Sequence, residues 1–405
     1  MIACVFTLGC KLNEVESASL AQGLKERGYD VIFYPAYADL YILNTCAVTK
    51  EAERKSRQAV TRLKRYNPAA KFIVCGCASQ HNPQAFSKND ALVFGTAHKG
   101  DILANLAESG VFLGTEEAFS PMPMPARVGT RAFLRVQDGC NRFCSYCLIP
   151  YLRGRSRSRN AEDIVNEAKA CNAKEIVLTG IDLSSYRDGE TDLCGLVEKL
   201  KDVSARFRFG SLEAGVIDER LLETMRAAGN FAEHFHLSLQ SGSNAVLRAM
   251  NRKYTREEFF EKCALIDKFF PDAAITTDVI VGFPTETEED FMQTVDLVEK
   301  VGFSRVHIFP YSPREGTNAA KLPDLPAEVK HDRADRLRRA AVAVAGKYVE
   351  RFLGREQEVL FEDLGGYTRN YIRVYAEGAR EGALCRVKLT RPFGDGAKGE
   401  VIEEI

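Results

Sequence analysis

The sequence predicts a multidomain α/β protein with three folded parts. Over the first 115 residues, short apolar runs alternate with amphipathic helical patterns, which is typical of a doubly wound parallel α/β domain. A second alternating series begins at Arg131 and predicts a partial (β/α)6 barrel. Short alternating strands separated by glycines follow and predict a small antiparallel β-barrel. We therefore expect folded parts at residues 1–115, 131–350 and 351–405, with residues 116–130 as a linker.

The strands of the N-terminal part are predicted by five apolar runs, Ile2–Leu8, Tyr29–Tyr34, Leu40–Leu43, Lys71–Cys75 and Ala91–Phe94. Between them, Glu14–Arg27 and Lys50–Tyr66 are amphipathic and predict helices. The segment Ser120–Val128 carries three prolines and has no periodicity, so we interpret it as the inter-domain linker.

The strands of the barrel are predicted at Phe133–Asp138, Glu175–Thr179, Arg206–Leu212, His234–Leu239, Ile275–Val281 and Arg305–Pro310. Helical patterns fill the gaps between them, for example at Ala161–Cys171, Glu219–Ala228 and Glu286–Val301. Six βα units are two short of a closed eight-fold barrel, so we expect an open, incomplete one.

A charged helix is predicted from Pro326 to about Phe352, at the end of the barrel part. It is followed by four alternating runs, EQEVLFEDL, YTRNYIRVYA, ALCRVKLTRPF and AKGEVIEEI, which glycines separate. Four such strands in a short segment favour a small antiparallel barrel.

Composition narrows the class of protein further. With 45% hydrophobic and 27% charged residues, the chain is neither disordered nor fibrous. The formal net charge of −1 means that a nucleic-acid partner must bind to local basic patches. No apolar run approaches the roughly 18 residues of a membrane span, and the N-terminus lacks signal-peptide features. We therefore expect a cytoplasmic protein whose twelve cysteines are reduced and available to a metal or cluster.

The most specific motif is a group of three cysteines, Cys140, Cys144 and Cys147, directly after the first barrel strand. Three thiolates within eight residues can face one point, and soft ligands of this kind suit an iron–sulfur cluster with one open iron. The alternatives are a zinc site without its fourth ligand or three unrelated thiols.

A second set of cysteines is dispersed over the N-terminal part. Cys10, Cys46 and Cys77 each lie just past a predicted parallel strand, at the edge where ligands gather in α/β sheets. Cys75 competes with Cys77 but lies within its strand, as Cys4 does. The alternative is that these thiols are small core residues.

Two basic segments are candidates for nucleic-acid binding. Arg153, Arg155, Arg157 and Arg159 follow the three-cysteine loop, where a phosphate contact, a solvated surface or support of the loop could explain them. In the C-terminal part, Arg369, Tyr371 and Arg373 offer basic and aromatic groups for unpaired bases.

The three-cysteine loop on a partial β/α barrel resembles the radical S-adenosylmethionine (SAM) enzymes. The resemblance extends along the strand ends, including TGID after the second strand, DVIVGFPTE at the fifth and FPYSPREGT at the sixth. It implies that SAM is contacted by Tyr146, Thr179, Gly180, Asp182, Glu213, Gln240, Asp278 and Phe309.

The motifs TLGCKLN, NTCAVT and CGCASQ, together with HLSLQSGSNAVLRAMNRKYT and GFPTETEEDF, resemble the methylthiotransferase family over nearly the whole chain. That resemblance implies an N-terminal cluster domain, a radical SAM domain and a C-terminal TRAM domain. It also implies two 4Fe–4S clusters, an auxiliary one on Cys10, Cys46 and Cys77 and a SAM-binding one on Cys140, Cys144 and Cys147.

The activity implied is radical insertion of a methylthio group into a tRNA base, with two SAM per turnover and no side-chain acid or base as catalyst. NTCAVT, HLSLQ and the segment Gly366–Val374 resemble the branch that acts on N6-threonylcarbamoyladenosine at position 37. Three alternatives remain: isopentenyladenosine in tRNA, an aspartate of a ribosomal protein, or a non-catalytic iron–sulfur RNA-binding protein. The expected partners are the tRNA anticodon stem-loop and a one-electron reductant such as flavodoxin or ferredoxin, and we expect a monomer.

Overall fold

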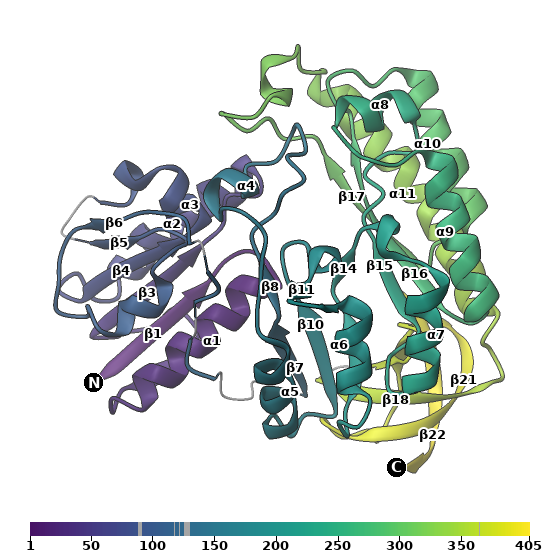
Figure 1. Cartoon of the computed structure of the whole chain (residues 1–405), viewed down its shortest axis with the longest axis horizontal. Helices are drawn as coiled ribbons and strands as arrows, with labels where there is room; N and C mark the ends of the chain where they lie inside the picture. The colour runs from purple at the N-terminus through teal and green to yellow at the C-terminus, as the bar shows by residue number, and fades with distance from the viewer. Residues whose placement is uncertain (88–90, 117, 121, 125–129, 364) are drawn as a thin grey trace.

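A computed structural model describes residues 1–87, 91–116, 118–120, 122–124, 130–363 and 365–405. It confirms the predicted fold class, a parallel α/β domain, an open parallel β/α barrel and a closed C-terminal β-barrel. Figure 1 shows the N-terminal domain on the left, the partial barrel at the centre and right, and the C-terminal barrel below it. Within the described residues, no helix is long and apolar enough to cross a membrane.

The N-terminal domain is a parallel sheet of six strands in the order β2-β1-β3-β4-β5-β6. Its strands are β1 Ile2–Thr7, β2 Asp30–Ile32, β3 Leu40–Thr45, β4 Lys71–Gly76, β5 Leu92–Phe94 and β6 Val111–Phe112. Its helices are α1 Lys11–Lys25, α2 Lys50–Lys64 and α3 Cys77–His81, with short 3-10 turns at Pro83–Ala85 and Lys99–Leu103. The two-residue edge strand β6 is exposed and too short to be predicted from its pattern.

Both faces of this sheet are buried, which explains the continuous apolar runs in its strands. Ala3 and Val5 of β1 pack with Leu20 of α1, whereas Cys4 packs on the opposite face with Leu63 of α2. The strands therefore end at one edge between two helical layers, and that edge carries Cys10, Cys46 and Cys77.

The barrel has two parallel sheets, β13-β10-β7 and β14-β15-β16-β17. Its strands are β7 Arg131–Arg135, β10 Glu175–Thr179, β13 Arg206–Phe209, β14 Ser211–Leu212, β15 His234–Leu237, β16 Ala274–Val281 and β17 Arg305–Pro310. The predicted strand Arg206–Leu212 is interrupted at Gly210, so it contributes one strand to each sheet. Within the described residues β7 and β17 do not pair, and the barrel is open on that side.

Helices cover the outside of the barrel strands (Figure 1). They are α5 Ala161–Ala170, α6 Leu193–Leu200, α7 Glu219–Ala228, α8 Asn244–Ala249, α9 Arg256–Phe269, α10 Glu288–Val301 and α11 Ala327–Glu350. The shorter elements are β8 Gln137–Asp138, α4 Ile149–Leu152, β9 Arg157–Ser158, β11 Arg187–Asp188 and β12 Thr191–Asp192. The N-terminus of α9 is fixed by a capping box between Thr255 and Glu258, a signal that is present in the sequence.

The C-terminal part is a closed barrel of five strands in the order β18-β19-β20-β22-β21. They are β18 Glu356–Glu362, β19 Gly365–Thr368, β20 Arg373–Tyr375, β21 Leu384–Phe393 and β22 Gly396–Glu404. One expected strand is divided in two, because Thr368 Oγ1 donates to Asn370 Oδ1 and accepts from the Ile372 amide, which turns the chain. The expectation of a purely antiparallel barrel is also corrected, since β20 and β22 pair in parallel.

Part of the predicted linker lies outside the described residues, namely 117, 121 and 125–129. Of the rest, Met122 packs against the core of the N-terminal domain and the Phe119 ring lies under the Arg135 guanidinium.

Candidate functional site

The loop between β8 and α4 brings Cys140, Cys144 and Cys147 together. Each sulfur accepts a hydrogen bond of 3.4 Å, from the amide of Arg142, from Arg252 Nη1 and from the amide of Ile149 respectively. Burial raises the pKa of Cys140 to about 11 and that of Cys147 to about 12, so metal binding must displace their protons. Three soft ligands with donors aimed at their sulfurs fit a cluster that carries negative charge.

The second group lies at the carboxyl ends of β1, β3 and β4. Cys10 precedes α1, Cys46 follows β3 and Cys77 begins α3. Burial raises the pKa of Cys46 to about 11, and the sulfurs of Cys77 and Cys10 raise it further, so the three thiols lie within electrostatic reach of one another. Cys75 instead lies inside β4, fully buried in the core beneath α1. This placement favours Cys77 as the ligand.

A glycine directly precedes three of the six cysteines, Cys10, Cys77 and Cys140, and the geometry at two of these glycines shows why. Gly76 has φ +108°, and a Cβ there would lie 2.5 Å from the Thr45 carbonyl oxygen. Gly139 has φ +69°, and a Cβ there would lie 1.9 Å from the Arg155 carbonyl oxygen. Any side chain would therefore move the backbone that aims Cys77 or Cys140.

The two cysteine groups face each other across the seam between the N-terminal domain and the barrel. After burial and the sulfurs of its own group, the sulfur of Cys77 also raises the pKa of Cys147. Helices α3 and α4, which flank the two groups, lie side by side in Figure 1. Thr96 Oγ1 donates to the Leu152 carbonyl oxygen and joins the domains beside them. The arrangement places two candidate cluster sites on opposite walls of one seam.

A buried ion-pair network fixes this seam. The Arg153 side chain is fully buried, with Nη1 3.0 Å from both Glu16 Oε1 and Asp138 Oδ1, and Nη2 2.9 Å from Asn13 Oδ1. Glu16 also pairs with Lys99. Burial alone would raise the pKa of Glu16, but Arg153 and Lys99 hold it well below its ordinary value. One arginine from the barrel therefore joins α1 to β8.

The expectation that the arginine run contacts phosphates is wrong for Arg153 and Arg157. Arg157 is also buried, and its Nη2 lies 2.9 Å from Asp138 Oδ2. Both guanidinium groups are neutralised by buried carboxylates and are closed to a polyanion, so they support the cluster loop. Arg155 is exposed above the Phe143 ring, and Arg159 pairs with Glu167.

Two of the three C-terminal residues expected to bind RNA hold the barrels together. Arg369 Nη2 donates to the carbonyl oxygens of Gly229 and Phe231 at 3.0 and 2.7 Å. The Tyr371 ring stacks on His234 of β15, with centroids 4.0 Å apart, and on Tyr367. These contacts correct the expectation for Tyr371, whose ring is stacked on two other rings, whereas RNA binding by the partly exposed Arg369 stays a prediction. Arg373 is half-buried and pairs with Asp395.

The strand-end residues expected to contact SAM form a connected set around the cluster loop. Arg142 Nε lies 2.9 Å from Asp182 Oδ2, and Arg252 Nη2 lies 2.5 Å from Glu213 Oε1. The sequence reasoning missed both arginines, although Arg142 lies between two of the cysteines and Arg252 lies in the quoted motif NRKYT. Because Arg252 also touches Cys144, this set couples the cluster loop to β14.

The remaining expected SAM contacts lie on the same rim. Thr179 and Gly180 end β10, and Tyr146 packs beside Met250 and Phe283. Gln240 has φ +67°, an unusual value for a residue with a side chain, and is bonded through its backbone to Asp278 and Ile280 of β16. Phe309, opposite Ile280 in the register, is 46% exposed.

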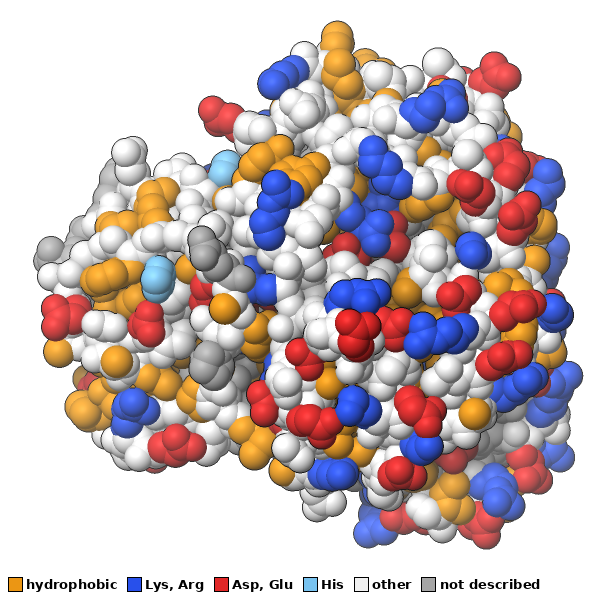
Figure 2. All heavy atoms as spheres, in the orientation of Figure 1, with side chains coloured by type: hydrophobic (Ala, Val, Ile, Leu, Met, Phe, Trp, Pro, Cys, Tyr) orange, Lys and Arg blue, Asp and Glu red, His pale blue; other side chains and the backbone are white. Residues whose placement is uncertain are grey.

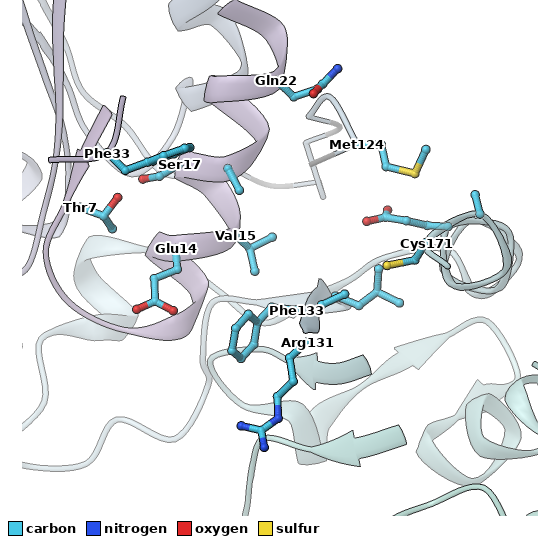
Figure 3. A pocket seen from close by; sticks show the side chains of 15 residues that line it. Thr7, Glu14, Val15, Ser17, Gln22, Phe33, Met124, Arg131, Phe133 and Cys171 are labelled. Atoms are coloured by element: carbon cyan, nitrogen blue, oxygen red, sulfur yellow. The ribbon is translucent and has the colours of Figure 1, made fainter. Parts of the chain in front are cut away.

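A cavity of about 500 Å³ lies nearby, between α1 and the strand β7 with helix α5 (Figure 3). Its lining is mainly apolar and includes Val15, Phe133 and Cys171. None of the six candidate ligand cysteines lines it, so it is separate from the cluster sites.

Comparison with known families agrees with this division of the chain. Residues 134–298 match the radical SAM superfamily, and residues 3–95 match an uncharacterized protein family, UPF0004. A threonylcarbamoyladenosine tRNA methylthiotransferase of Aquifex aeolicus is 39% identical over 95% of this chain and 98% of its own length. The chain belongs to the radical SAM methylthiotransferase family. It is therefore an enzyme, and the partial barrel with its three-cysteine loop is its radical SAM domain.

Other methylthiotransferases are similar to it over comparable lengths. The threonylcarbamoyladenosine tRNA methylthiotransferase of Bacillus subtilis is 35% identical over 98% of this chain and 96% of its own. The tRNA-2-methylthio-N6-dimethylallyladenosine synthase of Bacillus cereus is 36% identical over 98% of this chain and 85% of its own. Two branches of the methylthiotransferase family are thus nearly equally similar.

A solved radical SAM structure shares the fold. The radical SAM methyltransferase TsrM from Kitasatospora setae, with cobalamin and a 4Fe–4S cluster bound, aligns with a TM-score of 0.58 at 13% identity. The alignment covers 79% of this chain and 77% of that one. The α/β domain joined to an open barrel is therefore an arrangement found in another radical SAM protein.

Replacing Gly139 by Ala should remove the cluster of the radical SAM domain, because the added Cβ displaces the loop that carries Cys140. Iron content after anaerobic reconstitution should fall by about half if two 4Fe–4S clusters bind. Gly346→Ala is the matched control, since open space surrounds Gly346 on α11. Full iron content in Gly139→Ala would contradict the steric argument.

Replacing Arg153 by Met should destabilise the protein by about 3–5 kcal/mol, because Glu16 and Asp138 remain buried without their cation. Thermal unfolding measures the loss, and the exposed Arg155→Met is the control. If the two variants unfold at the same temperature, the network does not fix the seam.

Proposed function

We propose that this enzyme adds a methylthio group to the adenine 2-position of N6-threonylcarbamoyladenosine at position 37 of tRNA. The observation that carries the proposal is the pair of three-cysteine groups on opposite walls of one seam. The printed activity of the Aquifex and Bacillus subtilis relatives supports the nucleoside.

In this proposal each wall has its own role. Cys140, Cys144 and Cys147 hold the cluster that binds SAM, and Cys10, Cys46 and Cys77 hold an auxiliary 4Fe–4S cluster. When bound, the cluster on Cys140, Cys144 and Cys147 would supply the electron for cleavage of SAM, and a second SAM would supply the methyl group. The hydrogen bonds from Arg142, Ile149 and Arg252 hold the thiolates in place.

Residues at the ends of the barrel strands bind and orient SAM. Asp182 and Glu213, held by Arg142 and Arg252, offer carboxylates to the amino group and the ribose. The other contacts proposed are Tyr146, Thr179, Gly180, Gln240, Asp278 and Phe309. Closure of the substrate over this rim excludes water from a radical reaction that no side-chain base could perform.

The tRNA anticodon stem-loop approaches the seam from outside. Figure 2 shows acidic and basic side chains interspersed over the barrel face, so the contact depends on local basic groups. The candidates for this contact are Arg155, which is exposed beside the cluster loop, and the partly exposed Arg159, Arg369 and Arg373. A one-electron reductant completes the reaction.

The competing function is methylthiolation of isopentenyladenosine, supported by the similar identity of the Bacillus cereus enzyme. The two substrates differ in polarity, since the threonylcarbamoyl group ends in a carboxylate and a hydroxyl. A pocket for it needs a cation and hydrogen-bond donors, whereas an isopentenyl pocket should be apolar.

The reconstituted enzyme, given SAM and dithionite, should methylthiolate an anticodon stem-loop that carries threonylcarbamoyladenosine at position 37. The matched stem-loop with isopentenyladenosine should react at least about tenfold more slowly, because its apolar tail leaves polar groups unpaired. Mass spectrometry of the nucleosides measures both products. Efficient reaction of the isopentenyl stem-loop alone would contradict the proposal and assign the enzyme to the isopentenyladenosine branch.

A further inference from the structure

Lys11 directly follows Cys10, a proposed ligand of the auxiliary cluster, and has no role in the proposed function. It is the first residue of α1, directly after Cys10, and its side chain is exposed. Its Nζ lies 5.9 Å from the centroid of the Phe133 ring, so the lysine of one domain reaches the first strand of the other. An ammonium here lies beside both the auxiliary cysteines and the open side of the barrel.

Within the described residues, Lys11 forms no ion pair. Glu14 and Glu175 are the carboxylates that act on its charge, but neither lies within ion-pairing distance of it. Glu175 is already shared by three arginines of the barrel interior, Arg131, Arg206 and Arg208. Lys11 thus lies near several arginines, and binding of an anion would reduce the electrostatic repulsion between these cations.

The opposite wall of this space belongs to β15, β16 and β17. His236 Nε2 lies 3.2 Å from Asp278 Oδ2, and a ligand nitrogen of the exposed His307 lies within 4.8 Å of both. His236 Nδ1 is 2.9 Å from Thr276 Oγ1, which fixes the ring. Phe133, which Lys11 contacts, and His307 belong to β7 and β17, the two edge strands that flank the open side of the barrel, and the charge of Lys11 reaches His307.

The interior of the barrel is closed below this space. The Tyr371 ring from the C-terminal barrel stacks on His234, and Tyr367 stacks on Tyr371. Arg305 of β17 is held by Asp395 and does not compete with Lys11 for a ligand. Arg305 is therefore paired, whereas Lys11 has no ion pair within the described residues.

We propose that Lys11 and His307 together bind the carboxylate of the substituent on N6 of the substrate adenosine. This inference rests on the proposed function and names the residues by which the enzyme distinguishes a substrate with an anionic substituent from one with an isopentenyl group. The ammonium of Lys11 pairs with the carboxylate, and the His307 ring donates a hydrogen bond to it.

The same three residues, His236, Asp278 and His307, could instead hold a divalent cation, since two imidazoles and a carboxylate are common metal ligands. Among the charges that act on His307, Asp278 favours a cation, whereas His236, Arg305 and Lys11 oppose one. The ammonium of Lys11, which has no ion pair within the described residues, is the reason that we choose an anion, and the cobalt experiment below tests the metal.

The test compares two stem-loops that differ by one charge. One carries threonylcarbamoyladenosine at position 37, and the other carries its neutral carboxamide. The reconstituted wild-type enzyme should bind the acid about 10- to 100-fold more tightly than the amide, the range of one charge-assisted hydrogen bond. Lys11→Met and His307→Gln should each reduce this preference, whereas Lys11→Arg should retain most of it.

Lys25→Met is the matched control, because Lys25 is exposed at the far end of α1, and it should keep the wild-type preference. Iron content and the cluster absorbance of each variant report whether the site is intact. Unchanged discrimination in Lys11→Met with full iron would overturn the inference.

Further outcomes separate this inference from the proposed function. A wild-type enzyme that methylthiolates acid and amide stem-loops equally would overturn the carboxylate site and leave the proposed function standing. One that acts on the isopentenyl stem-loop alone would overturn both. Stoichiometric cobalt(II) binding to the wild-type holoenzyme, lost in His307→Gln, would identify a metal site and overturn the inference.

Discussion

The buried guanidinium of Arg153 is the contact on which the arrangement of this enzyme depends. It bonds to Glu16 and Asn13 of the N-terminal domain and to Asp138 of the barrel, with no exposure of its side chain. Removing charges from water costs several kcal/mol for each ion, so such a network is a poor source of stability by itself. Its directional bonds instead admit one register between the domains, because a shifted register would leave a buried charge unpaired.

That register between the domains determines where the two cysteine groups lie relative to each other. Asp138 ends β8, directly before the cysteine loop, while Asn13 and Glu16 lie on the first turns of α1, directly after Cys10. The network therefore connects the backbone segments that carry the two cysteine groups. Arg314 and Glu53 make a second buried pair between the barrel and α2, which prevents rotation about the first. The two cysteine groups, which we propose as cluster sites, belong to separate domains and are thus held on facing walls.

Much of this structure follows from the sequence alone. The strands are short apolar runs between amphipathic helices, and their carboxyl ends carry the Gly-Cys pairs, so both the topology and the cysteine groups could be predicted. Positive backbone angles at Gly76 and Gly139 give the physical reason for that motif. The capping box at Thr255 can likewise be predicted, because its residues are close together in the sequence.

Long-range pairing could not be read in the same way. A run of alternating arginines has the same pattern whether it meets phosphates or buried carboxylates, and the partners of Arg153 lie up to 140 residues away. Arg369 and Tyr371 have the composition of an RNA surface, yet the docking of two barrels buries their contacts. Lys11 lacks an ion pair with Glu175 because Arg131, Arg206 and Arg208 already pair with that carboxylate, and such pairings leave no local pattern in the sequence.

The central claim is that two iron–sulfur clusters face each other across the seam that Arg153 fixes. Electron paramagnetic resonance of the reduced, reconstituted enzyme tests it most directly. The spectrum of the wild type should show broadening and faster relaxation from spin–spin interaction between neighbouring clusters. This broadening should be absent when either cysteine group is replaced by alanines. A wild-type spectrum equal to the sum of the two single-cluster spectra would contradict the account.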